Sequence, residues 1–308
     1  MVVVTVLLLT ELKHTFTEFA QRMKNDEMIT LAKFLAISGI ILPMLPHKNL
    51  IPDINLTPYS IWLATVVVSG ISYLSYLLKR YVFHESGTLV SGIIGGLYSS
   101  TATISVLARK SRKASEQEAT DYVAAMLLAV SMMFLRFMIL ILIFSREIFL
   151  SIYPYLLTMA VVAAIVAWFI HSRQKRPEDQ PAETEEDDSS NPLEFKVALI
   201  FAVLFVIFTF LTHYTLVYAG TGGLNLLSFV SGFSDITPFI LNLLQNTGSV
   251  AALIITACSM QAIISNIMVN MFYALFFAGK GSKLRPWILG GFGVVIVCNL
   301  VLLLFFYI

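Results

Sequence analysis

The sequence predicts an all-α protein, a polytopic transmembrane helix bundle of about nine spans. Of its 308 residues, 57% are hydrophobic and only 13% are charged, whereas soluble domains carry about 25% charged residues. The mean hydropathy is +0.82. Several apolar runs approach the roughly 20 residues that a helix needs to cross a bilayer. The net charge of +1 gives no broad basic surface, so we expect no nucleic-acid partner.

Residues 1–27 differ from the spans that follow. The opening "MVVVTVLLLT" is apolar but too short to cross about 30 Å of hydrocarbon, so it is interpreted as the tail of a truncated helix or a short interfacial segment. Residues 11–27 place apolar side chains on one helical face and basic ones off it. This pattern predicts an amphipathic helix in the membrane interface.

The remaining chain divides into two membrane halves, residues 28–172 and 196–308. The spans that we expect are about 28–45, 58–78, 88–108, 122–144 and 148–170 in the first half, and 197–218, 223–244, 250–276 and 287–308 in the second. Residues 173–195 between them are acidic, contain proline and lack aromatic residues until their last position. This composition predicts a disordered linker.

Similar motifs in the two halves predict an internal repeat. Tyr98-Ser99-Ser100 matches Phe233-Ser234-Asp235 at an offset of 135 residues, and Ser131 and Arg136 match Ser265 and Asn270 at an offset of 134. Two four-helix units of the same orientation would then be related by an axis along the membrane normal, as in some transporters.

Two charged residues lie deep in the predicted spans. They are Asp235, among 19 acidic residues, and Arg136, among 20 basic ones. A charge at the bilayer centre costs at least about 2.5 kcal/mol, so such residues normally face a cavity or a partner. Counting helix rise puts Arg136 about 12 Å and Asp235 about 18 Å from the same membrane face. The sequence therefore predicts one polar layer that both halves build.

We expect the helices that carry this layer to be broken. Gly232 and Pro238 bracket Asp235, and a proline removes a helical hydrogen bond and clashes with the preceding turn. In the first half, the pair Gly95-Gly96 and the hydroxyl residues after it allow a similar break. The candidate solute- or ion-binding residues are Gly95, Gly96, Ser99, Ser100, Thr101, Thr103, Arg136, Gly232, Ser234, Asp235, Thr237, Asn266 and Asn270.

Each candidate also has a purely structural interpretation. The spacing of Gly92, Gly96 and Ser100 is typical of close helix packing. Arg136 and Asp235 are compatible with a structural salt bridge, and Asn266 and Asn270 with ordinary interhelical hydrogen bonds.

The segments "GGLYSSTATISVLARKS", "SGFSDITPFIL" and "AIISNIMVN" resemble the membrane domain of unknown function found C-terminal to MgtC/SapB-type domains. The resemblance covers most of the chain. The family pattern has a second acid where this chain has Thr237 and a lysine where it has Asn270, whereas Asp235 and Asn266 match. The resemblance implies a protein of the cytoplasmic (inner) membrane of a bacterium or archaeon, and it supplies no substrate.

Three classes of function follow from these observations. The first is a transporter or translocase for a small solute or lipid headgroup, in which Arg136 binds an anionic group or pairs with Asp235, and Asp235 binds a cation or carries a proton. The second is a membrane scaffold or regulator, including a homodimer. The third, an enzyme, we do not expect, because one intramembrane acid cannot form an aspartyl protease dyad and His213 has no catalytic motif. We expect no cofactor and no metal site, and membrane lipid and a small solute or ion as partners.

Overall fold

The computed structural model describes residues 25–52, 54–83, 87–112, 116–173, 195–245, 250–279 and 282–307. These residues form helices and one isolated bridge between Ile51 and Ile54, with no named strand among them. The helices are α2 (Asn25–Met44), α3 (Pro58–Leu77), the π-helical turn η1 (Leu78–Val82), α4 (Thr88–Lys110), α5 (Glu116–Phe144), α6 (Arg146–Ser172), α7 (Phe195–Ser231), α8 (Ile236–Gln245), α9 (Ala252–Ala278) and α10 (Arg285–Tyr307). The interfacial helix predicted within residues 11–27 lies almost wholly outside the described residues, and so does the linker predicted at 173–195.

The described part contains eight helices that are long and apolar enough to cross a membrane. The prediction of an all-helical architecture is confirmed for the described residues, and these eight helices are candidate membrane spans. The predicted spans agree with the helices to within a few residues, as in 88–108 against α4 and 148–170 against α6. Capping hydrogen bonds explain where some of these helices begin. Thr57 and Ser60 form a capping box at the start of α3, and Ser145 Oγ accepts a hydrogen bond from the Ile148 N–H at the start of α6.

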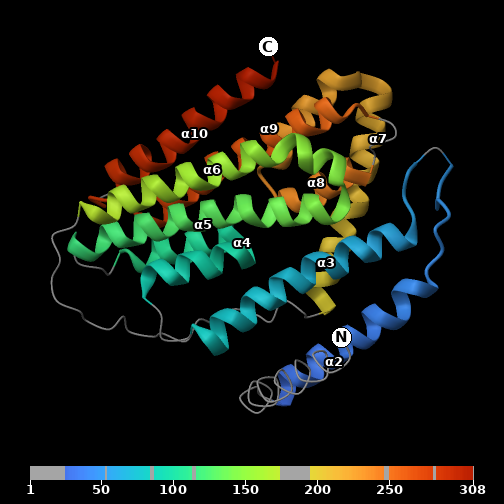
Figure 1. Ribbon diagram of the computed structural model, residues 1–308, viewed down its shortest axis with the longest axis horizontal. Helices are drawn as coiled ribbons and strands as arrows, with labels where there is room; N and C mark the ends of the chain where they lie inside the picture. The colour runs from blue at the N-terminus through green and yellow to red at the C-terminus, as the bar shows by residue number, and fades with distance from the viewer. Residues whose placement is uncertain are drawn as a thin grey trace, which may run out of the picture.

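The second half departs from the predicted span boundaries. No loop separates 197–218 from 223–244, because α7 runs through Ser231 and is interrupted only at Gly220, where φ is 59° and ψ is −151°. Glycine alone adopts this conformation readily, so a single residue redirects the helix (Figure 1). The rest of the predicted span is α8, which has only 10 residues. The count of nine spans and the two-unit repeat stay predictions.

The bundle is built around α9 and α5, which carry many of the fully buried side chains. In the most apolar 18-residue stretch of α9, 72% is buried inside the protein, whereas in the corresponding stretch of α2 only 6% is buried. Figure 1 shows α2 at the edge of the molecule, beside α3. Between α4 and α5 the backbones approach closely, since a Cβ on Gly96 would lie 2.5 Å from Ala129 Cα, and Gly92 meets the backbone of Ala125 in the same way. The predicted packing role of these two glycines is confirmed.

Candidate functional site

Helix α4 is broken at Ser99, as the sequence predicted. The residue has extended torsions, φ −158° and ψ 107°, inside an otherwise helical segment. Its side-chain oxygen accepts a hydrogen bond from the Ala102 N–H at 3.4 Å, so it acts as the N-cap of the second half of the helix. A Cβ on Gly95, before the break, would lie 2.5 Å from Thr103 Oγ1, after the break. The two segments of α4 therefore approach each other closely.

The chain is also broken between α7 and α8, again as predicted. The carboxylate of Asp235 accepts a hydrogen bond from the Thr237 N–H at 2.9 Å, which places Asp235 as the N-cap of α8. Because α8 begins at Ile236, Pro238 lies in its first turn, where no intrahelical partner for an N–H exists. Gly232, just before the break, packs against Ser265 of α9 so closely that a Cβ would overlap that side chain.

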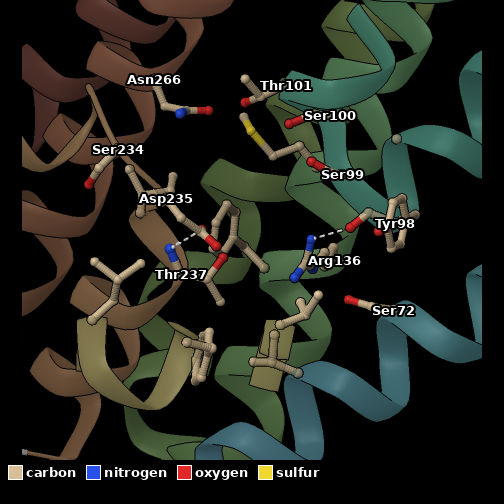
Figure 2. Close-up of a pocket in the computed structure, with 18 of the residues that line it drawn as sticks. Ser72, Tyr98, Ser99, Ser100, Thr101, Arg136, Ser234, Asp235, Thr237 and Asn266 are labelled. Atoms are coloured by element: carbon tan, nitrogen blue, oxygen red, sulfur yellow. Dashed lines mark hydrogen bonds between the residues drawn. The ribbon is translucent and has the colours of Figure 1, made fainter. Parts of the chain in front are cut away.

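The two breaks border one cavity of about 410 Å³. Figure 2 shows side chains from both breaks turned toward it. Its polar lining comes from α3, α4, α5, α8, α9 and the turn before α8, and comprises Ser69, Ser72, Tyr98, Ser99, Ser100, Thr101, Arg136, Ser234, Asp235, Thr237, Asn266 and Tyr273. The predicted polar layer is therefore present as a cavity that both halves of the chain line.

Arg136 reaches into this cavity from α5. Its Nη1 donates a hydrogen bond to the Tyr98 carbonyl oxygen at 2.7 Å, which is one of the backbone groups that the break at Ser99 leaves without a helical partner. Its Nε is buried and has no hydrogen-bond partner. The guanidinium therefore caps a broken helix end and still has an unused donor.

Asp235 lies on the other side of the cavity, beside Ser234 and Thr237 (Figure 2). The expected pairing with Arg136 is not formed, since the charged side chains that lie within 4.0 Å of each other among the described residues are those of Arg80 and Glu27, and the one further contact at this distance is that of the His171 ring with Asp121. The reason is local. Each charged side chain bonds the backbone at its own helix break, and these bonds hold the two charges apart.

Asn266 belongs to the cavity wall and also holds the second break in place. Its Nδ2 donates to the Gly232 carbonyl oxygen at 3.2 Å, and its Oδ1 accepts from Asn270 Nδ2 at 3.1 Å. Asn270 is fully buried behind it, away from the cavity lining, with an unpartnered Oδ1. The interhelical hydrogen bonds that the sequence suggested as an alternative are therefore present, and for Asn266 they coexist with a place at the cavity.

Nine of the thirteen candidate residues line the cavity, and four do not. The four are Gly95, Thr103, Gly232 and Asn270, which shape or support the breaks. Sequence reasoning missed Ser69 and Ser72 of α3, as well as Tyr98 and Tyr273. The serines had a detectable signal, because Thr65, Ser69, Ser72 and Ser75 form a hydroxyl stripe at helical spacing.

The cavity offers hydroxyls, one amide, one guanidinium and one carboxylate. Within the described residues no group of three or more His, Cys, Asp or Glu side chains is placed to hold a metal ion. The lining can bind charged and polar groups of a small molecule.

A comparison with protein families gives one match, over residues 66–278, to the domain of unknown function DUF4010. The chain belongs to the DUF4010 family. The match begins inside α3 and ends at the last residue of α9, so it contains both helix breaks and every residue that lines the cavity. Helices α2 and α10 lie outside it.

A relative of this chain occurs in Aquifex aeolicus (strain VF5), where it is described as an uncharacterized protein. It is 24% identical over 227 residues, which cover 72% of this chain and 96% of the relative. No solved structure matches the chain.

Proposed function

We propose that this protein is a transporter or translocase that moves a small solute or a lipid headgroup through the cavity between the two helix breaks. The observation that carries the proposal is the cavity of about 410 Å³ at the breaks, lined by both Arg136 and Asp235. Broken helices at substrate sites are a recurrent feature of secondary transporters, because half-helix ends present unpaired backbone groups to the substrate. Irregular backbone at membrane depth is otherwise tolerated only where protein or cavity water satisfies it.

The contacts around the two breaks support the repeat on which such transporters are built. Gly96 packs on Ala129 and Gly232 packs on Ser265, and both members of the second pair follow the first by 136 positions. The N-caps Ser99 and Asp235 differ by the same 136 positions. This offset replaces the predicted 135 and pairs Asp235 with Ser99 instead of Ser100.

A third pair of contacts follows the same offset. Gly92 packs on Ala125, and 136 positions later Ser228 Oγ donates to Gln261 Oε1 at 2.7 Å. The contacts between helices follow the same correspondence, in which α5 corresponds to α9, α6 to α10 and the second part of α4 to α8. The contact of α6 with α9 therefore matches that of α10 with α5, and the contact of α4 with α9 matches that of α8 with α5. An approximate twofold relation between two four-helix units accounts for all of these contacts.

The alternative function, a scaffold or regulator with a structural Arg–Asp pair, rests on a dry interface and a closed ion pair. Among the described residues, Arg136 and Asp235 are not paired, and a cavity lies between the helices that carry them. These observations favour a path over a scaffold.

We place the protein in the inner membrane of a bacterium or archaeon, without catalytic activity, and retain the link to MgtC/SapB-type domains as a prediction.

The test asks whether charged water-soluble reagents reach the cavity. In a background in which Cys258 and Cys298 are changed to alanine, Thr101→Cys is treated in proteoliposomes with a membrane-impermeant cationic thiosulfonate, added outside or trapped inside. If a solute path reaches the cavity, the reagent should label the introduced thiol. Val297→Cys is the matched control, because Val297 on α10 is 58% exposed on the apolar exterior and a lipid-facing thiol should stay unlabelled. If Thr101→Cys reacts no faster than Val297→Cys from either side, the proposed path is wrong.

A further inference from the structure

The charges in the cavity suggest which kind of molecule it accepts. Of the described residues that line it, Arg136 and Asp235 are the pair with formal charge, one positive and one negative. They come from α5 and from the turn before α8, and no contact within 4.0 Å joins them in the described structure. The cavity wall thus carries one positive and one negative pole that are not joined by an ion pair.

Each pole has binding capacity left. At the positive pole, Arg136 Nε is buried without a partner, and the break at Ser99 starts a half-helix whose N-terminal N–H groups favour negative charge. At the negative pole, Asp235 uses Oδ1 to cap α8, which leaves Oδ2 for a cationic donor. Both bonds that these side chains already make are to neutral backbone groups.

A ligand with a single charge would compensate one pole and leave the other without a partner. That is costly above all for Arg136, whose Nε is buried within the bundle, whereas Asp235 is exposed. A ligand with one cationic and one anionic group would compensate both. A cavity of about 410 Å³ also falls within the usual range for small-molecule sites, about 300–1,000 Å³, and is far larger than a bare ion needs.

We infer that the cavity binds a zwitterion, with an ammonium group at Asp235 and a carboxylate or phosphodiester group at Arg136. The inference rests on the proposed path and narrows its substrate class. The hydroxyls of Ser100 and Thr101 and the amide of Asn266, which lie above the two charges in Figure 2, would bind further polar groups of the ligand. The same chemistry occurs in free amino acids and in the headgroup of phosphatidylethanolamine.

The experiment compares matched ligands on the full chain in micelles of an uncharged maltoside detergent, with the midpoint of thermal unfolding as the readout. One set is β-alanine, propionate and propylamine, which share a three-carbon chain. A second set is glycerophosphoethanolamine against glycerophosphoglycerol. We expect at least one zwitterion to give half of its maximal stabilisation at a concentration at least tenfold lower than its singly charged analogues. The same micelles doped with phosphatidylethanolamine or with phosphatidylglycerol then distinguish a lipid headgroup from a free solute.

Two variants make the test specific for the charges. Asp235→Asn should make the site prefer the anionic analogue, and Arg136→Gln should make it prefer the cation, whereas loss of a merely structural bond would weaken all ligands alike. Ser75→Ala, on the same helix α3 but outside the cavity lining, where its hydroxyl donates to the Ile71 carbonyl oxygen, should leave the order of preference unchanged. The inference is overturned if a singly charged analogue binds as well as its zwitterion, if no probe or lipid binds, or if the variants do not reverse the order. Labelling of Thr101→Cys would in each case still support the path, so the two failures are distinguishable.

Discussion

The contact between α4 and α5 gives the sharpest test of the architecture. We consider Gly96→Ala, which adds one methyl group at a position where it would lie 2.5 Å from Ala129 Cα and 2.7 Å from its carbonyl oxygen. The matched change is Gly70→Ala in the middle of α3, where nothing lies within 4 Å of the added atom. Both substitutions replace a helical glycine by alanine, so they differ mainly in what the methyl group meets.

The magnitudes follow from two terms. Alanine is favoured over glycine inside a helix by about 1 kcal/mol, and this gain applies to both variants. Overpacking costs about 1–3 kcal/mol, and we expect the upper end for Gly96→Ala because the atoms it meets belong to the backbone and cannot rotate away. Gly96→Ala should therefore lose about 2 kcal/mol of stability and Gly70→Ala should gain about 1 kcal/mol.

The assay is thermal unfolding of the two purified variants in the same detergent at one scan rate. A difference of about 3 kcal/mol corresponds to roughly 6–12 °C between the midpoints, at about 2–4 °C per kcal/mol for a large domain. An equal or higher midpoint for Gly96→Ala would refute the close approach of α4 and α5 and, with it, the geometry that places the break at Ser99 beside Arg136.

Three further predictions concern other parts of the bundle. Gly232→Ala should lower the unfolding midpoint in the same assay, because its Cβ would overlap a side chain of α9. Tyr155→Phe removes the hydrogen bond from the buried Tyr155 hydroxyl to Asn299 of α10 and should cost about 1–2 kcal/mol, measured by denaturant unfolding, whereas an unchanged midpoint would contradict that bond. Glu27→Gln removes the acid that pairs with Arg80 at 2.6 Å, so hydrogen exchange in α2 should become faster while exchange in α5 stays the same.

Some features of the site could be predicted because they depend on local chemistry. Gly232 and Pro238 around an intramembrane Asp235 indicated a break, since glycine and proline act on the backbone wherever they occur. Hydroxyl residues after Gly95-Gly96 indicated the second break on similar grounds. The depth of Arg136 followed from helix rise alone.

Other features could not be read from the sequence, because they depend on how the helices are rotated and joined. Helix rise gives the depth of Arg136 but not the direction of its side chain, and the nearest acceptor proved to be the Tyr98 carbonyl. Ser72 lines the cavity only because α3 turns that face inward. The buried acid Glu27 lies against Tyr76 of α3 and Arg80 of η1, residues about 50 positions away whose contact has no sequence signal.

Gly220 has a mechanical consequence for the cavity. Because no loop joins 195–219 to 221–231, any change in the angle between these parts is concentrated in the torsions of this one residue. The segment after it acts as a lever about 16 Å long, at 1.5 Å per residue, and its far end leads into the turn that carries Asp235. A rotation of about 10° at this pivot would move that end by roughly 3 Å, as follows from the lever length. That distance is comparable to the length of a hydrogen bond, so a small torsional change at Gly220 is enough to remake the contacts of Asp235.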